Sequence, residues 1–287
     1  MTVADRDFTH MARALKLAAR GLNTTDPNPR VGCVLVQGEE VVGEGFHQRA
    51  GGPHAEVVAL AAAGERARGA TAYVTLEPCS HHGRTPPCVE ALLAAGVARV
   101  VFAVGDPNPQ VNGGGVARLR EAGIVVDGGV LETSARALNP GFLSRMERGR
   151  PWVRVKLASS LDGRTALAHG ESRWITGDAA RADVQKLRAR ASALLTGSGT
   201  VLQDDPRLNV RLPGATRQPL RIVLDPELET PPEARILAPP GETILMTASQ
   251  DAVRAGRLAA AGARVENLPR DGNGLDLQAV MARLTEL

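Results

Sequence analysis

The amino-acid sequence predicts an α/β protein of two domains. Strand-like and helix-like segments alternate along most of the 287 residues, and this alternation is typical of a sheet, at least partly parallel, that carries helices on its faces. The chain is also too long for one average domain and suits two of roughly 100 to 200 residues each. The polar stretch SRMERGRP, residues 144–151, separates two differently patterned regions. We therefore expect a first domain at 1–146 and a second domain at 151–287.

The first region is predicted to open with a helix over residues 8–22, where apolar residues recur at three-to-four spacing. The segments after it follow the order β-β-α-β-α-β, and ligands of such sheets bind at the strand ends. These segments are a hairpin of strands at 31–36 and 41–45, a helix at 54–64, a strand at 71–76, a helix at 89–96 and a strand at 98–104.

The second region alternates in the same way. Its predicted strands are 152–158, 193–196, 220–225 and 242–247, and its predicted helices are 178–191, 251–262 and 275–287. No predicted strand follows the last helix, and a crossover helix without its next strand lacks the sheet position for which its apolar face is suited. We therefore expect this domain to be truncated partway through an α/β unit.

Composition narrows the class of protein. Three cysteines are too few for a disulfide framework, and the opening stretch at 5–20 is amphipathic, unlike a secretory signal. No apolar run approaches the roughly 18 residues of a membrane helix. Net charge is only +3 and aromatic residues make up 2% of the chain, which gives few stacking platforms for nucleic acid. We expect a cytoplasmic protein that binds a small anionic ligand, with neither a membrane nor a nucleic acid as partner.

The stretch LEPCSHHGRTPPC, residues 76–88, contains two of the three cysteines. Cys79 follows a predicted strand and Cys88 begins a predicted helix, while His54 begins another helix in GGPHAE. Zinc prefers these nitrogen and sulfur ligands, and three protein ligands leave the fourth position for water, as in catalytic sites. Two thiolates offset the charge of the ion, so the water needs a nearby base, for which Glu56 is the candidate.

Other interpretations of these residues stay open. A disulfide between Cys79 and Cys88 is disfavoured in a reducing cytoplasm. A structural zinc would need a fourth ligand, which Cys33, His81 or His82 could supply. Cys33 lies in VGCVLV and is most simply a buried core thiol, and the two histidines could equally be exposed loop residues.

The second region contains two weaker signals. Lysine is rare in this chain, and alternation in WVRVKLA puts Lys156 on the polar-capable face of the predicted strand, where it could also be a solvated edge residue. The turn GSGT at 197–200 follows a strand and could bring backbone N–H groups to a phosphate, but it lacks the third glycine of a dinucleotide fingerprint.

Taken together, HAEVVAL, TLEPCSHHGRTPPC, NPRVGCVLV and DPNPQVNGGG resemble the bifunctional deaminase-reductase family of riboflavin biosynthesis, usually called RibD. In that family the long spacer between the cysteines is the norm. KLASSLDGRTA, GESRWITG and GTVLQDDPRL are similar to its reductase half, so the resemblance covers nearly the whole chain from about Asp5. It implies a cytidine-deaminase-like three-layer α/β domain followed by a domain similar to dihydrofolate reductase.

The resemblance also implies a reaction and its residues. The first domain would deaminate 2,5-diamino-6-ribosylamino-4(3H)-pyrimidinone 5′-phosphate with one zinc ion, and the second would reduce the ribosyl chain to ribityl with NADPH. Because the family continues beyond the last predicted helix with a further phosphate-binding segment, we expect the reductase step to be weak in this chain. The zinc ligands implied are His54, Cys79 and Cys88, and the catalytic residues are Glu56 and Lys156. Substrate contacts implied are Asn28, His47, His81, Arg84, Asp106, Asn108, Ser172, Leu208 and Arg211, and NADPH contacts are Ala158, Trp174, Thr200 and Asp204.

Each implied contact has a plainer explanation, since Asn28 and Asn108 both lie in Asn-Pro turns. Two rival functions also remain, a deaminase of another nucleotide or of a tRNA base, and a non-catalytic zinc-stabilised nucleotide-binding protein. The P-C-x₈-C spacer and the second domain argue against the first rival. Glu56, which a structural zinc site does not need, argues against the second. A homo-oligomer is compatible with the sequence.

Overall fold

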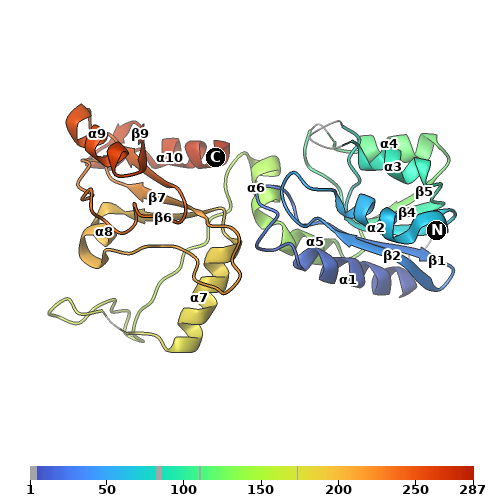
Figure 1. Cartoon of the computed structure of the whole chain (residues 1–287), viewed down its shortest axis with the longest axis horizontal. Coiled ribbons are helices and arrows are strands. Elements are labelled where there is room, and N and C mark those ends of the chain that lie inside the picture. Colours follow the sequence, from blue (N-terminus) through green and yellow to red (C-terminus); the bar gives the residue numbers. More distant parts are fainter. Residues whose placement is uncertain (1–4, 82–85, 110, 173) are drawn as a thin grey trace. The chain divides into compact units, whose positions relative to one another are not determined.

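The structure is a computed structural model that describes residues 5–81, 86–109, 111–172 and 174–287. The chain divides into two compact units, Met1–Pro151 and Trp152–Leu287, each of which is an α/β arrangement of its own (Figure 1). Within these described ranges, none of the helices is both long and apolar enough to span a bilayer.

The first unit is built on a five-stranded sheet of order β2-β1-β3-β4-β5. β1 pairs antiparallel with β2 and β3, while β3, β4 and β5 run parallel. The partly parallel sheet that alternation predicts is therefore present, with one further strand, β5, that was not predicted. The strands are β1 (Gly32–Gln37), β2 (Glu40–Phe46), β3 (Thr71–Leu76), β4 (Arg99–Val104) and β5 (Val125–Gly128). The helices are α1 (Asp5–Ala19), α2 (Ala55–Ala63), α3 (Cys88–Ala94), α4 (Gly114–Glu121), α5 (Glu132–Leu138) and α6 (Pro140–Arg148), with a short 3₁₀ turn at Gly64–Ala67.

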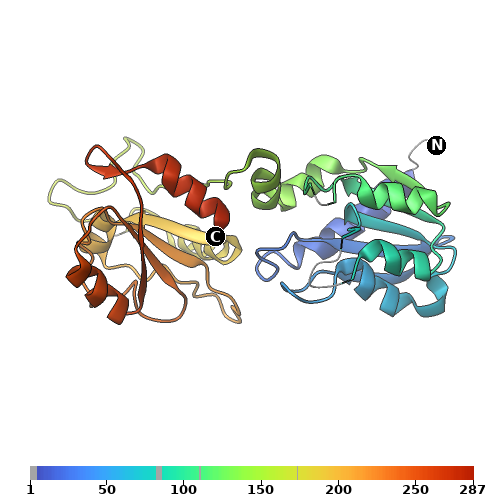
Figure 2. The ribbon, with the colours of Figure 1, turned by 90° about the horizontal axis from the view of Figure 1, so that it is seen from above.

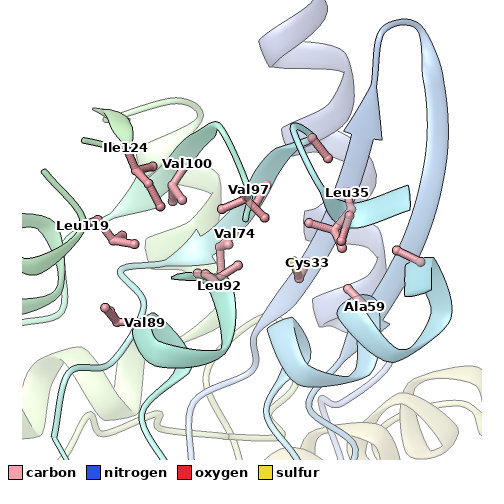
Figure 3. Close-up of a cluster of buried hydrophobic side chains, with 14 of the residues drawn as sticks. Cys33, Leu35, Ala59, Val74, Val89, Leu92, Val97, Val100, Leu119 and Ile124 are labelled. Carbon is pink, nitrogen blue, oxygen red and sulfur yellow. The ribbon is translucent and has the colours of Figure 1, made fainter. Parts of the chain in front are cut away.

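Hydrophobic cores cover both faces of this sheet, because successive side chains of a strand point to opposite faces. On β1, Cys33 and Leu35 belong to the core shared with α2, α3 and α4, whereas Val34 and Val36 belong to the core shared with α1 and α5. Figure 3 shows side chains of the first core meeting between strands and helices. The three layers, helices on both sides of a sheet, follow from this alternation.

Two helices approach the β1–β2 hairpin closely enough to require glycine. A Cβ atom added at Gly32 would lie 2.1 Å from the carbonyl oxygen of Ala14 in α1. One added at Gly45 would lie 2.3 Å from the carbonyl oxygen of Ala55 in α2. The absence of a side chain at Gly32 therefore permits the close approach of α1, and its absence at Gly45 permits that of α2 and the residues at its start.

A buried ionic network joins α1 to the sheet. Arg99 of β4 donates to both carboxylate oxygens of Asp7, at 2.8 and 3.0 Å, and to Asp127 of β5 at 2.8 Å. The hydroxyl of Tyr73 donates to Asp7 at 2.8 Å. Burial, followed by the carboxylate of Asp7, raises the pKa of Tyr73 to about 12. These bonds satisfy a carboxylate that has no exposed surface.

The second unit has a four-stranded parallel sheet of order β6-β7-β8-β9. α8 and α9 contribute Val201 and Leu258 to the core on one face, and α10 contributes Val280 to the core on the other. The strands are β6 (Ala193–Gly197), β7 (Leu220–Leu224), β8 (Thr243–Thr247) and β9 (Ala263–Asn267), with a short hairpin of β10 (Arg270–Asp271) and β11 (Gly274–Leu275). The helices are α7 (Asp178–Arg190), α8 (Ser198–Asp204), α9 (Ala252–Ala260) and α10 (Leu277–Glu286), which Figure 2 shows from a second direction.

One predicted element of this unit is wrong. Residues 152–158 form no strand, and Val155 and Leu157 are 75% and 79% exposed. Side chains alternate along residues 152–158 as they do in a strand. A strand also needs a neighbouring strand whose backbone groups complete its hydrogen bonds. Within the described residues, the four-stranded sheet does not provide that neighbour. The last helix, by contrast, does have a sheet face, because Val280 packs with Ile222 and Ile244.

Candidate metal centre and active site

Three side chains from separate elements of the first unit converge at one end of its sheet. His54 is the N-cap residue of α2, Cys79 follows β3, and Cys88 is the first residue of α3. Their Nδ1 and two Sγ atoms lie within 4.8 Å of one another. His54 Nδ1 is 3.0 Å from Cys88 Sγ and 3.6 Å from Cys79 Sγ. Zinc takes nitrogen and sulfur ligands of these types, so the donor set fits the ion in chemistry, and its atoms are close enough together to share one ion.

The two thiols have unequal electrostatics. The backbone N–H of Cys88 donates to Cys79 Sγ at 3.3 Å. Hydrogen bonding from the Cys88 thiol, followed by that from His54, lowers the pKa of Cys79 to about 4. The same bond, together with burial, raises the pKa of Cys88. The pair is therefore arranged to carry negative charge beside His54, which suits a divalent cation.

Glu56 lies in the first turn of α2 and is only 3% exposed. Burial raises the pKa of its carboxyl, and the nearby charge of Cys79 adds to the effect. A carboxyl whose pKa is raised by its surroundings is better able to hold a proton and return it to a substrate. Its position two residues after His54 places it beside the cluster without making it a ligand in the described set.

The residues that could have supplied a fourth zinc ligand, or formed a disulfide, lie in different parts of the first unit. Cys33 is fully buried in the core of β1, and burial raises the pKa of its thiol. The cysteines at 79 and 88 are free thiols. His81 lies in the loop after β3, and its Nδ1 is buried without a hydrogen-bond partner in the described part of the chain. His82 lies outside the described residues, as does Arg84.

A cavity of about 400 Å³ opens above the cluster. The residues that line it come from the loop before β1, the start of α2, the ends of β3 and β4, and α6. The predicted site residues that line it are Asn28, His47, His54, Glu56, Cys79, His81, Asp106 and Asn108. The structure thus brings together residues that are up to 80 positions apart in the sequence, from 28 to 108.

A short hydrogen-bond chain orients one cavity residue. His47 Nδ1 lies 3.0 Å from the carbonyl oxygen of Pro53, which can only accept, so Nδ1 carries the hydrogen. Burial lowers the pKa of His47, and the neutral ring then accepts at Nε2 from the amide nitrogen of Asn28, 3.1 Å away. The amide oxygen of Asn28 is therefore directed elsewhere and can accept a hydrogen bond from a ligand.

Glu77 is a site residue that the sequence did not predict. This 4% exposed carboxylate accepts backbone N–H bonds from Asp106, Gly113 and Val116, at 3.3, 3.2 and 3.2 Å. It therefore anchors the loop after β4, in which burial, followed by the charges of Glu77 and Cys79, raises the pKa of Asp106 to about 6. Its place directly after a buried strand was the available signal, since functional side chains gather at strand ends.

Two other lining residues, Arg145 and Met146, were not predicted either. They lie on α6, in the stretch whose sequence indicated only a domain boundary. Residue type gave no signal there, because a basic residue near a helix end has ordinary reasons to occur.

The predicted residues of the second unit are more dispersed. Lys156 and Ala158 lie on the unpaired segment, Ser172 and Trp174 in the long loop before α7, and Thr200 and Asp204 on α8. Trp174 is 71% exposed and stacks with the guanidinium of Arg181, 4.4 Å from its ring centre. Leu208 has a left-handed φ of +49°, and the backbone N–H of Arg211 donates to Gln185. No hydrogen bond or ion pair links these predicted contacts to one another within the described residues.

A histidine and a cysteine at helix starts, a second cysteine after a strand and a buried glutamate two residues after the histidine, all in a three-layer α/β domain, define the zinc-dependent deaminase class. Sequence comparison agrees with this class. Residues 4–104 match the cytidine and deoxycytidylate deaminase zinc-binding region, and residues 151–287 match the RibD C-terminal domain.

The chain belongs to the RibD family of riboflavin biosynthesis proteins. It is 55% identical to riboflavin biosynthesis protein RibD of Escherichia coli, over 97% of this chain and 78% of that protein. It is 45% identical to RibD of Aquifex aeolicus, over 99% of this chain and 79% of that protein. The solved structure of Acinetobacter baumannii RibD, 49% identical, matches with a TM-score of 0.90 over 98% of this chain and 77% of that one. A Thermotoga maritima diaminohydroxyphosphoribosylaminopyrimidine deaminase/5-amino-6-(5-phosphoribosylamino)uracil reductase, 38% identical, matches with a TM-score of 0.86 over 98% of this chain and 78% of that one.

The family confirms the fold and function predicted from the sequence. The chain is a bifunctional enzyme of riboflavin biosynthesis, with a deaminase domain and a reductase domain. Zinc is the cofactor of the first domain and NADPH that of the second.

Proposed function

We propose that the first domain deaminates 2,5-diamino-6-ribosylamino-4(3H)-pyrimidinone 5′-phosphate and that the second reduces the ribosyl chain of the product to ribityl. The observation that carries the proposal is the position of Glu56 beside the His54–Cys79–Cys88 cluster in a cavity lined by amide and carboxylate side chains. The similar Thermotoga maritima protein is named for the same pair of activities, a deaminase and a reductase.

In the deamination, His54, Cys79 and Cys88 would hold zinc, which when bound would supply an acidified water molecule. Glu56 would accept a proton from the attacking water and pass protons to the pyrimidine, so that ammonia leaves and the carbon that carried the amino group becomes a carbonyl. Glu56 is 3% exposed and lines the cavity, so its carboxyl faces the space in which the substrate would bind.

Substrate recognition in this domain is assigned to the polar residues of the cavity. Asn28 presents the amide oxygen that His47 leaves free, and Asp106 and Asn108 lie on the loop that Glu77 anchors. Such groups can read the donors and acceptors of a pyrimidine edge. His81, and Arg84 outside the described residues, complete the set of contacts proposed for this small phosphorylated ligand.

For the reduction, NADPH supplies the hydride and the protein positions the reactants. We assign Ala158, Trp174, Thr200 and Asp204 to the cofactor. The indole of Trp174 and the side chains of Thr200 and Asp204 on α8 are exposed and therefore accessible to NADPH. Lys156 contributes to the active site, and the substrate contacts are Ser172, Leu208 and Arg211.

The test is ammonia release from the diaminopyrimidine nucleotide by the full chain, before and after dipicolinate treatment, followed by zinc addition. We expect release to stop with the chelator and to return with zinc. dCMP and an adenine-containing tRNA stem-loop serve as alternative substrates. Turnover of either one in place of the diaminopyrimidine would overturn the proposal, and turnover that survives complete metal removal would overturn the catalytic role of the cluster. The cytoplasmic location expected from the sequence stays a prediction.

A further inference from the structure

The deaminase cavity contains a cationic side chain to which no role is yet assigned. Arg145 of α6 lines the cavity together with Phe142 and Met146. It is the sole lysine or arginine among the described residues that line it. The same cavity contains the carboxyl groups of Glu56, Glu77 and Asp106, so one arginine shares the lining with three acidic residues.

The guanidinium of Arg145 has no protein partner in the part of the chain that is described. Other charged groups do have partners: Arg136 donates to both carboxylate oxygens of Glu147 at 2.7 Å, and Glu77 of the cavity accepts from the backbone N–H of Asp106 at 3.3 Å. Arg145 is half-buried, whereas Arg148, one turn further along, is exposed. A partly buried charge without a counter-ion costs free energy that a bound anion can offset.

α6 is held firmly in relation to the residues that read the base. Asn139, which precedes the helix and is 2% exposed, exchanges two hydrogen bonds with the backbone of Arg30, at 2.7 and 2.9 Å. Arg30 is two residues from Asn28, so one bonded pair joins the segment of Asn28 to the helix of Arg145. Ser144 closes the other end of α6 by donating to the carbonyl oxygen of Arg150 at 2.9 Å.

We propose that Arg145 binds the 5′-phosphate of the pyrimidine nucleotide and thereby selects phosphorylated over dephosphorylated substrate in the deamination step. The inference rests on the proposed function, to which it adds a specificity-determining residue. A guanidinium matches phosphate oxygens with two parallel hydrogen bonds. With Asn28 and Arg145 fixed to one another through Asn139, the ring and the phosphate are held at a set separation.

The experiment compares ammonia release from the diaminopyrimidine nucleotide and from its 5′-dephosphorylated form. The variants are Arg145→Ala and Arg145→Lys, with Arg148→Ala as the matched control on the exposed side of the same helix. We expect Arg145→Ala to lower kcat/KM for the phosphorylated substrate by about 10- to 100-fold, mainly through KM, and to leave the dephosphorylated one nearly unchanged. Arg145→Lys should restore part of the loss, and Arg148→Ala should match the unaltered chain.

Zinc content and circular dichroism report whether each variant is folded. Equal losses for the two substrates, or no loss for either, would overturn the assignment, and so would a loss in Arg148→Ala as large as that in Arg145→Ala. Absence of ammonia release from the unaltered, zinc-loaded chain would refute the deaminase reaction itself, and the assignment of Arg145 with it. A wrong role for Arg145 would be seen only in the comparison of variants, whereas absence of the deaminase reaction would already be seen in the chain without a substitution.

Discussion

Glu56 combines nearly complete burial with a place two residues from His54, which we propose as a zinc ligand. Its carboxyl therefore meets its reaction partners through the cavity that it lines. Glu56→Gln keeps the size of the side chain and its burial but removes the group that accepts a proton. We expect the variant to retain zinc and fold and to lose about 10²- to 10⁴-fold in kcat.

Steady-state ammonia release and elemental analysis of the purified variant check this prediction. A kcat within a few-fold of that of the unaltered chain would remove Glu56 from the mechanism. Loss of zinc together with activity would instead identify it as a support for the cluster.

Single site residues could be predicted from the sequence when their chemical role follows from the type of side chain. His54, Glu56, Cys79 and Cys88 are recognisable because histidine, cysteine and glutamate stand at the predicted starts and ends of elements. Glu77 was not recognisable as an anchor, since its role depends on three backbone N–H groups between residues 106 and 116. The direction in which these backbone N–H groups point is set by the folded loop and cannot be read from the types of residue in it.

Helix α2 depends on a glycine for its position. A Cβ at Gly45 would meet the backbone oxygen of Ala55 at 2.3 Å, and backbone cannot move aside as a flexible side chain can. Gly45→Ala should therefore displace the start of α2, lower stability by about 1 to 3 kcal/mol and reduce zinc occupancy. Urea unfolding and zinc analysis measure the two effects.

Gly141→Ala is the matched control for this substitution. Gly141 lies in α6 with nothing within 4 Å of an added Cβ, so it should leave stability and zinc content almost unchanged. If Gly45→Ala behaves like this control, the close approach of α2 does not position the metal ligands.

An ion-pair cluster joins β9 to α10 in the second unit. Arg283 donates to both oxygens of Glu266 at 2.7 and 3.0 Å, and Arg264 lies 2.8 Å from the same carboxylate. Hydrogen bonding from Arg283 lowers the pKa of Glu266 below its usual value of 4.5. The stabilisation from a lowered carboxyl pKa is fully present above the unfolded-state pKa and is lost as pH falls through the folded-state value.

Glu266→Gln should therefore lower the Tm of the second unit at pH 7, and the difference from the unaltered chain should shrink as pH falls below about 4.5. Differential scanning calorimetry at pH 7, 5 and 3 measures this dependence. A Tm difference that stays constant over this range would show that packing, and not charge, accounts for the effect of the substitution.

Helices and strands could be predicted where a strong apolar pattern also has a neighbouring element to pack or pair with. Examples are β3, which pairs with β4, and α9, whose Leu258 lies in a core. β9, with the sequence ARVEN, exposes charged residues that pair across to α10 and Glu242, so its pattern is weak. Residues 152–158 show the reverse case, in which a clear alternation forms no strand because pairing depends on a neighbour that alternation cannot specify.

The molecule as a whole contains two units, each with cores on both faces of its own sheet. All described residues that line the deaminase cavity lie before Pro151. A fragment of residues 1–151 should therefore fold, bind one zinc ion and release ammonia at a rate within about threefold of the full chain. Circular dichroism, zinc analysis and the deaminase assay on the fragment provide the check. An unfolded or zinc-free fragment would mean that the first unit needs the second for its stability.

The cavity takes its walls from positions 27 to 146, and this span has a consequence for the order in which the protein is made. All three cluster residues have been synthesised by residue 88, but the helix of Arg145 follows only after residues 89–145. At about 5 to 20 residues per second, those 57 positions take roughly 3 to 11 s. For that interval a nascent chain contains the three proposed zinc ligands without the helix that forms one wall of the substrate pocket. The substrate pocket can therefore close only after all three cluster residues have been made.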